Sequence, residues 1–113
     1  MGESKGKVFL FGSESMGQDE NMGFEILVTL LDTLMKREEP IKAMIFWNTA
    51  VSLLAGDSPV WGRLKTLEEK GVEIVAGKFC VQDLCIADQI VVGRVAVMDE
   101  ILDLLLHNEV ISL

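Results

Sequence analysis

The sequence is poor in the residues and runs from which metal sites, membrane spans and secretion signals are built. It has one histidine and two cysteines in 113 residues, and no second cysteine pair or histidine cluster completes a zinc site. No apolar run approaches the roughly 20 residues of a membrane span, and residues 1–7 are polar where a signal peptide has an apolar core. We therefore expect a cytoplasmic protein with free thiols, no metal and no membrane association.

Positive charge is also scarce. Ten Lys and Arg residues stand against 18 Asp and Glu residues, and the formal net charge at pH 7 is −8. Nucleic acids and anionic membranes are recognised by clustered basic side chains, whereas the basic residues here are scattered along the chain. The sequence therefore argues against a nucleic-acid partner and against binding to an anionic membrane surface.

Apolar residues, by contrast, are abundant. They make up 50% of the chain, and the mean hydropathy is +0.35. A chain of 113 residues has room for one domain. A single core uses much of this apolar surface, and the excess indicates that the protein covers some of it by self-association. We expect one domain over residues 1–113 and a homo-oligomer.

Short apolar runs alternate along the chain with apolar stripes at helical spacing. Runs without polar alternation are typical of strands buried on both faces, and intervals of three and four are typical of amphipathic helices. The alternation predicts a three-layer, flavodoxin-like α/β fold: a five-stranded, mostly parallel sheet with helices on both faces. The predicted strands are 7–11, 41–47, 72–76, 93–96 and 110–113, and the predicted helices are 22–35, 50–55, 57–70, 81–90 and 98–107.

Several residues predict where these helices begin and end. Asp19 or Asn21 is expected to cap the first helix. Pro59 fits the first turn of the third helix, where its missing N–H costs no hydrogen bond. Gly71 is expected to end that helix in the left-handed conformation.

In an open parallel sheet, ligands bind beyond the carboxyl ends of the strands. Four predicted loops lie at that edge: 12–21, 48–49, 77–81 and 96–98. Asn48 is a candidate lining residue, although it also suits a helix cap. The residues expected to line a pocket at this edge are Gly12, Ser13, Ser15, Met16, Asn48, Thr49, Lys78, Phe79 and Met98.

Cys80 is the most suggestive residue at this edge, because it follows a predicted strand and precedes a predicted helix. A thiol at a helix N-terminus feels the positive end of the helix dipole, which favours the nucleophilic thiolate. Lys78 nearby would add to this effect. The alternative is a cysteine that fills a small apolar gap, as free cysteines commonly do. That packing interpretation is preferred for Cys85, which is predicted inside the helix and off the face of Cys80.

The only histidine is predicted to lie far from Cys80. His107 ends the last helix, and helix C-termini in this architecture lie at the opposite edge, where the strands begin. There it complements the helix dipole. A Cys–His pair within one chain is therefore not expected, which argues against protease and acyl-transfer chemistry.

The loop at 12–21 does not suit a nucleotide. Its carboxylates, Glu14, Asp19 and Glu20, would repel a phosphate, and neither GxGxxG nor GxxxxGK[ST] is present. We expect no flavin and no other cofactor. Trp47 and Trp61 are interpreted as core or subunit contacts.

Several segments in a fixed order carry a family resemblance. They are VFLFGSESMG at 8–17, IFWNTAV at 45–51, LEEKGVEI at 67–74 leading to Cys80, then Val92-Gly93, Met98 and VISL at 110–113. Together they resemble the DsrE-like family of small sulfur-relay proteins. They look closest to the C-terminal domain of YedF-like proteins, which are described as selenium-metabolism-associated and sulfurtransferase-like. The resemblance covers nearly the whole chain.

The resemblance implies a flavodoxin-like fold, homo-oligomers (dimers, trimers or hexamers) and, in sulfur-relay members, a cysteine that carries a persulfide. The matching cysteine is Cys80. The chain departs from the family pattern at three points. The earlier cysteine of a CGTC-like turn falls on Gly77, an Asn before the helix methionine falls on Val97, and these 113 residues include no TusA-like domain.

We therefore expect a sulfur-relay protein whose Cys80 carries a persulfide in intracellular sulfur or selenium metabolism. Such a protein is at most a sulfurtransferase-like carrier, with sulfur-donor and acceptor proteins such as a TusA-like protein as partners. The alternative is a non-catalytic, oligomeric binding module that keeps the fold and transfers no sulfur.

Overall fold

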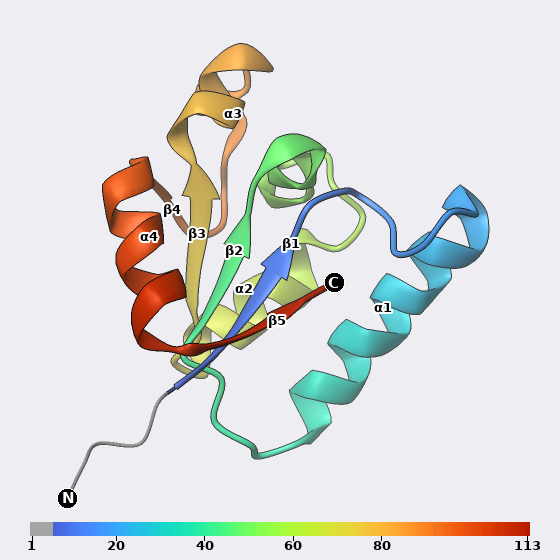
Figure 1. Ribbon diagram of the computed structural model, residues 1–113. Helices are drawn as coiled ribbons and strands as arrows, with labels where there is room; N and C mark the ends of the chain where they lie inside the picture. Colours follow the sequence, from blue (N-terminus) through green and yellow to red (C-terminus); the bar gives the residue numbers. More distant parts are fainter. Residues whose placement is uncertain (1–5) are drawn as a thin grey trace, which may run out of the picture.

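Five parallel strands form the middle layer of the molecule. In the computed structural model, which describes residues 6–113, they are β1 (Lys7–Phe11), β2 (Ala43–Phe46), β3 (Glu73–Gly77), β4 (Arg94–Ala96) and β5 (Glu109–Ser112). Their order across the sheet is β4-β3-β2-β1-β5, and all four pairings are parallel (Figure 1). The predicted three-layer, flavodoxin-like α/β fold is confirmed.

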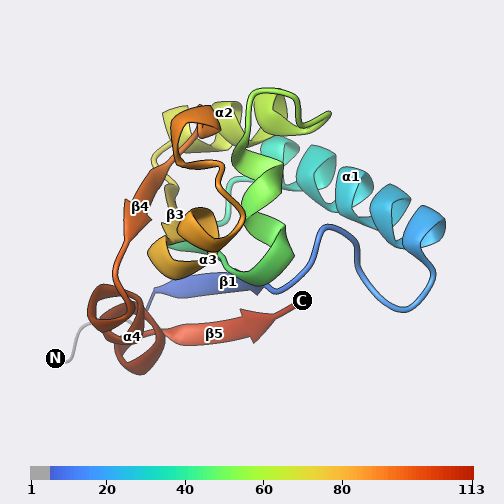
Figure 2. The ribbon, with the colours of Figure 1, turned by 90° about the horizontal axis from the view of Figure 1, so that it is seen from above.

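Helices cover the two faces of the sheet unequally. α1 (Glu20–Lys36) and α2 (Trp61–Glu69) lie side by side over one face, and α4 (Met98–His107) covers part of the other (Figure 2). The chain moves from β1 to β4 in one direction, and α4 then carries it back to β5, beside β1. Because crossovers between parallel strands are right-handed, this reversal puts α4 on the opposite face from α1 and α2.

Short helical segments occupy the edge of the sheet where β2 and β3 end. They are η1 (Asn48–Leu54), α3 (Lys78–Asp83) and η2 (Ala87–Gln89), all in the upper part of Figure 1. The short helix predicted at 50–55 is present as the 3-10 helix η1, which starts two residues earlier, at Asn48. Within residues 6–113, no helix is both long and apolar enough to cross a bilayer.

The first helix is capped by Asp19, one of the two residues predicted for this role, and it begins at Glu20, two residues before the predicted start. The side chain of Asp19 caps it by accepting the Met22 N–H at 2.8 Å. Its inner stripe of Gly23, Leu27 and Leu31 is buried against the sheet. Gly23 is required there, because a Cβ would lie 2.4 Å from the carbonyl oxygen of Met16 in the preceding loop.

The helix predicted at 57–70 is shorter than expected. It begins at Trp61, so Pro59 lies before the helix and not in its first turn. The Ser58 hydroxyl accepts the Val60 N–H at 3.2 Å and holds this approach in a turn. The helix ends as predicted, because Gly71 follows it with φ +104°.

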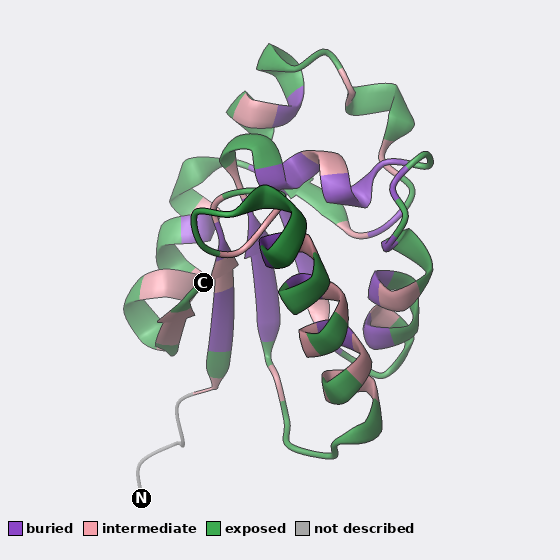
Figure 3. Ribbon diagram, turned by 90° about the vertical axis from the view of Figure 1, so that its right-hand side faces the viewer, coloured by how far each residue is buried: buried purple, intermediate pink, exposed green. Residues whose placement is uncertain are grey.

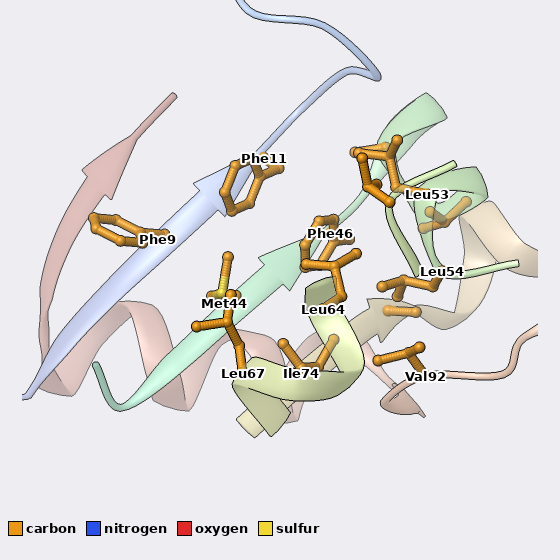
Figure 4. Close-up of a cluster of buried hydrophobic side chains, with 14 of the residues drawn as sticks. Phe9, Phe11, Met44, Phe46, Leu53, Leu54, Leu64, Leu67, Ile74 and Val92 are labelled. Atoms are coloured by element: carbon orange, nitrogen blue, oxygen red, sulfur yellow. The ribbon is translucent and has the colours of Figure 1, made fainter. Parts of the chain in front are cut away.

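The main core lies between the sheet and the α1–α2 layer. The rings of Phe11 and Phe46, on adjacent strands, stack with their centroids 4.8 Å apart (Figure 4). Neighbouring strand residues point to the opposite face, so Ile45 belongs to a second, smaller core beneath α4. The members of this second core are Val8, Ala43, Ile45, Val75, Ala96 and Ile101.

Candidate functional site

A cavity of about 350 Å³ lies at the carboxyl edge of the sheet, where the ends of β2, β3 and β4 meet α3 and the first turns of α4. This is the edge at which ligands bind in open parallel sheets. Most of the lining is apolar, and it includes one thiol residue, one amide residue and one lysine. The lining residues are Trp47, Asn48, Gly77, Lys78, Phe79, Cys80, Ala96, Met98 and Ile101.

Cys80 contributes a thiol to the lining of this cavity. It is the third residue of α3, and its side chain is half-buried. The backbone N–H of Asn48, at the start of η1, donates to its Sγ at 3.0 Å. Asn48 has φ +56°, in the left-handed region that asparagine tolerates better than most residues. The connection after β2 therefore supplies a fixed hydrogen-bond donor to the sulfur.

The helix that carries Cys80 starts earlier and ends earlier than predicted. Residues 77–80 were expected to form a turn before a helix at 81–90, but α3 starts at Lys78 and ends after six residues, at Asp83. A helix this short has a small dipole, so the Asn48 N–H is the more specific electrostatic contact of Cys80.

Cys85 is not the buried packing residue that was expected inside a helix. It lies beyond the end of α3 with φ +57°, and its side chain is exposed. Both cysteines are free thiols. Cys85 thus offers a thiol that is more accessible than Cys80 but lies outside the cavity lining.

The structure places only some of the predicted lining residues at the Cys80 cavity. Asn48, Lys78, Phe79 and Met98 line the cavity together with Cys80. Thr49 joins Asn48 and Cys80 in a small adjoining cleft of about 80 Å³.

The predicted residues of the first loop do not line the Cys80 cavity. Ser13 and Ser15 line a separate hollow of about 390 Å³, beside Glu14, Glu20 and Thr49. Met16 packs against the main core. Gly12 lies beside the Trp47 ring, whose Nε1 would be 3.8 Å from a Cβ at that glycine.

Several lining residues were not predicted for this role. Trp47 follows β2 and Ala96 ends β4, both at the carboxyl edge of the sheet. The same rule for sheet edges could therefore have identified them from the sequence. Ile101 comes from the inner face of α4 and looks like an ordinary core residue in sequence. Gly77 ends β3, and a Cβ there would be in ordinary contact with the Sγ of Cys80, at 3.7 Å. Its lack of a side chain leaves the space beside the sulfur open.

His107 lies away from the cavity, as predicted. It ends α4 at the edge where the strands begin, and its Nδ1 lies 2.8 Å from the carbonyl oxygen of Asp103. The other tryptophan, Trp61, starts α2 and is 41% exposed.

Arg94 on β4 links the neighbouring elements that frame the cavity. Its guanidinium pairs with the carboxylates of Glu73 on β3 and of Glu100 in the first turn of α4. The hydrogen bond from Arg94 lowers the pKa of Glu100, and the bonds to Glu100 and Glu73 raise the pKa of Arg94. These pairs hold the start of α4, which brings Met98 and Ile101 to the cavity.

Arg94→Met is expected to lower the Tm by a few degrees at pH 7, because its ion pairs are partly exposed to water. Since folding lowers the pKa of Glu100, that carboxylate stabilises the fold above its ordinary pKa of 4.5. The contribution is lost as the pH falls through the lower folded value. Calorimetry from about pH 3 to 7 should show the Tm difference between variant and wild type shrinking below about pH 4. A difference that stays constant with pH contradicts this role of the pair.

Comparisons with known proteins support the fold. Neither a family model nor a curated protein matches the sequence. A solved structure of the protein of unknown function MTH1491 from Methanobacterium thermoautotrophicum superposes with a TM-score of 0.74 at 17% identity, covering 97% of this chain and 100% of that chain. The conserved protein of unknown function BT1422 from Bacteroides thetaiotaomicron gives a TM-score of 0.67 at 19% identity, covering 95% and 94%. The chain therefore shares its α/β fold, over nearly its full length, with these two proteins.

Proposed function

We propose that this chain is a sulfur carrier of the DsrE-like, YedF-like kind, in which Cys80 holds a sulfane sulfur as a persulfide. The observation that carries the proposal is the position of Cys80. Its Sγ faces an apolar cavity of about 350 Å³ at the functional edge of the sheet and accepts a backbone N–H at 3.0 Å. A directed donor of this kind suits a sulfur atom that carries negative charge during thiol exchange.

The proposed reaction is an exchange of one sulfur between two thiols. The Cys80 thiolate attacks the outer sulfur of a donor persulfide, R–S–SH. The S–S bond of the donor breaks as a new S–S bond forms on Cys80, and the donor leaves as a thiolate that takes up a proton. Cys80–SH and R–S–SH thus become Cys80–S–SH and R–SH, with no external oxidant or reductant. Transfer to an acceptor thiol is the same step in reverse.

The exposed apolar residues at the cavity support delivery of sulfur by partner proteins. Phe79 and Met98 line it yet are 77% and 56% exposed, so its rim presents apolar surface to the solvent. Such a rim suits contact with a second copy of the chain or with sulfur-donor and acceptor proteins, such as a TusA-like protein. We accordingly propose a homo-oligomer that takes part in intracellular sulfur or selenium metabolism.

Mass spectrometry of the intact chain tests the proposal directly. After incubation with a small persulfide donor such as cysteine persulfide, the protein should gain the mass of one sulfur. Peptide mapping should assign that sulfur to Cys80. A wild-type protein that gains no sulfur, or gains it elsewhere, overturns the proposal.

The hydrogen bond from the Asn48 N–H to Cys80 leads to a separate prediction about the rate of persulfide formation. Asn48→Val should slow persulfide formation on Cys80 about tenfold, because a β-branched residue resists φ +56° and the N–H must turn away from the sulfur. Asn48→Gly accepts this conformation and should keep the wild-type rate. Stopped-flow labelling of variants with matched Tm values checks the result, and equal rates in the two variants contradict a role for this hydrogen bond.

A binding module without sulfur transfer is the second candidate. It is favoured by the apolar lining and exposed rim of the cavity, which need no chemistry from Cys80 to bind a small apolar ligand. Thiol alkylation separates the two functions. If Cys80 reacts with an alkylating reagent only after unfolding, the binding module is the better interpretation.

A further inference from the structure

Gly77 ends β3 beside the thiol of Cys80, and neither its backbone nor its neighbours require a glycine. Its φ is −66° and its ψ is 123°, a conformation that any residue adopts. A Cβ there would lie 3.4 Å from the Cβ of Trp47, 3.7 Å from the Sγ of Cys80 and 3.8 Å from the carbonyl oxygen of Phe46. These are ordinary van der Waals distances, so the thiol form of the protein has room for an alanine at this position.

The space left by the missing side chain lies where a buried strand meets the Cys80 cavity. Gly77 is buried, like the rest of β3 from Ile74 onward, and it lines the cavity together with Trp47. The helix that follows is mostly exposed. Figure 3 shows this change from buried strands in the middle of the molecule to largely exposed helical segments above them. The space is therefore bounded by strand backbone and by the first carbon of an indole side chain.

We propose that this space receives the outer sulfur of a persulfide on Cys80. The proposal rests on the proposed carrier function and adds the place at which the transferred atom is held. An S–S bond is about 2.05 Å long, whereas 3.7 Å separates Sγ from the position of a Cβ at Gly77. A sulfur attached to Sγ and directed toward Gly77 would therefore overlap the methyl group of an alanine. Glycine accepts this one additional atom, and alanine excludes it.

The other contacts of the thiol favour this direction for the outer sulfur. The Asn48 N–H donates to Sγ at 3.0 Å, so the outer sulfur cannot occupy that side. On the open side of the cavity, Phe79 and Met98 are 77% and 56% exposed. A sulfane sulfur there would meet free thiols from solution, which remove it by exchange. Beside the buried Gly77 it would be shielded from them.

The equilibrium of the sulfur exchange tests the proposal in Gly77→Ala. Each protein also carries Cys85→Ser, so that Cys80 is its only thiol. The full chain is equilibrated with cysteine persulfide and cysteine at fixed ratios, where Cys80–SH and the donor persulfide form Cys80–S–SH and cysteine. Intact mass spectrometry measures the loaded fraction.

The exchange constant should be at least about tenfold lower in Gly77→Ala than in the wild type, because the methyl group overlaps the added sulfur. A methyl group that only obstructed the donor would slow the exchange and leave this constant unchanged. The thiol form of Gly77→Ala should keep the Tm of the wild type within about 2 °C, because the added methyl group meets no close contact.

Gly12→Ala is the matched control. Its methyl group lies at the same edge of the sheet, 3.8 Å from Trp47 Nε1, and has no other neighbour within 4 Å beyond the adjacent residues. It should load like the wild type. Equal exchange constants for Gly77→Ala and the wild type, or the same loss in Gly12→Ala, overturn the proposal. So does a thiol form of Gly77→Ala that melts far below the wild type, because the fold itself would then require the glycine. A wild-type protein that takes up no sulfur overturns the carrier function, and the placement of the sulfur with it.

Discussion

Cys80→Ser is expected to abolish the gain of sulfur from a persulfide donor, and Cys85→Ser is expected to keep it. Serine has nearly the size of cysteine, and its oxygen can accept the Asn48 N–H that Sγ accepts at 3.0 Å. The fold and the cavity should therefore survive the change, while the atom that forms the S–S bond is gone. Labelling on Cys80 should fall from about one sulfur per chain to background.

Cys85 makes this comparison a test of the site. It is exposed, whereas Cys80 is half-buried, so reactivity governed by access alone would label Cys85 first. Reactivity governed by the cavity and its donor would label Cys80. Intact mass spectrometry of the two single variants distinguishes these outcomes. Equal Tm values for the two variants would show that neither change alters the fold. Sulfur retained by Cys80→Ser and lost by Cys85→Ser would show that exposure alone controls the reaction, and the carrier proposal would fail.

The sequence predicted the layers of the fold because its strands are buried on both faces. Runs such as 7–11 and 72–76 have no polar alternation, and the structure confirms strands there with helices on either side of the sheet. The order β4-β3-β2-β1-β5 was not predicted. Hydrophobic periodicity reports which side chains are buried and contains no information on which strand each one pairs with.

Short helical segments were the least predictable elements. A continuous helix at 81–90 fits the apolar spacing. The helix nevertheless ends at Asp83, and Cys85 adopts φ +57°. Ile86 and Ile90 still pack on the main core, which is why their spacing resembles a helical stripe. Tertiary contacts at the sheet edge therefore override a pattern that local sequence cannot distinguish from a helix.

The candidate site was predicted in part, through the rule for sheet edges. Cys80, Asn48 and Met98 follow three different strands and meet at one cavity, because the carboxyl ends of parallel strands lie together. The first loop follows β1 at the same edge, but Ser13 and Ser15 line another hollow. Its path depends on the close contact of Met16 with Gly23, a long-range fit that sequence spacing does not encode.

Gly93 allows β4 to lie close enough to β3 to position one side of the cavity. It precedes β4 with φ +78°, and its N–H donates to Glu68 Oε2 at 2.9 Å. A Cβ at this position would lie 2.6 Å from the carbonyl oxygen of Ile74 on β3 and 2.7 Å from its Cγ2. The close approach lets β4 pair with β3 and leads the chain to Ala96 and Met98 at the cavity.

Gly93→Ala should therefore destabilise the protein by about 3 kcal/mol, the sum of a left-handed alanine and a steric overlap with the neighbouring strand. Gly62→Ala is the matched control. It adds the same methyl group within α2, where nothing lies within 4 Å, and should stabilise the protein by up to about 1 kcal/mol.

Urea unfolding measures both changes in stability. Persulfide labelling of Cys80, at a temperature where both variants are folded, reports on the cavity. Because β4 must shift to relieve the overlap, Gly93→Ala should also label more slowly than Gly62→Ala. A cost below about 1 kcal/mol with unchanged labelling would mean that β4 does not need this close approach to frame the site.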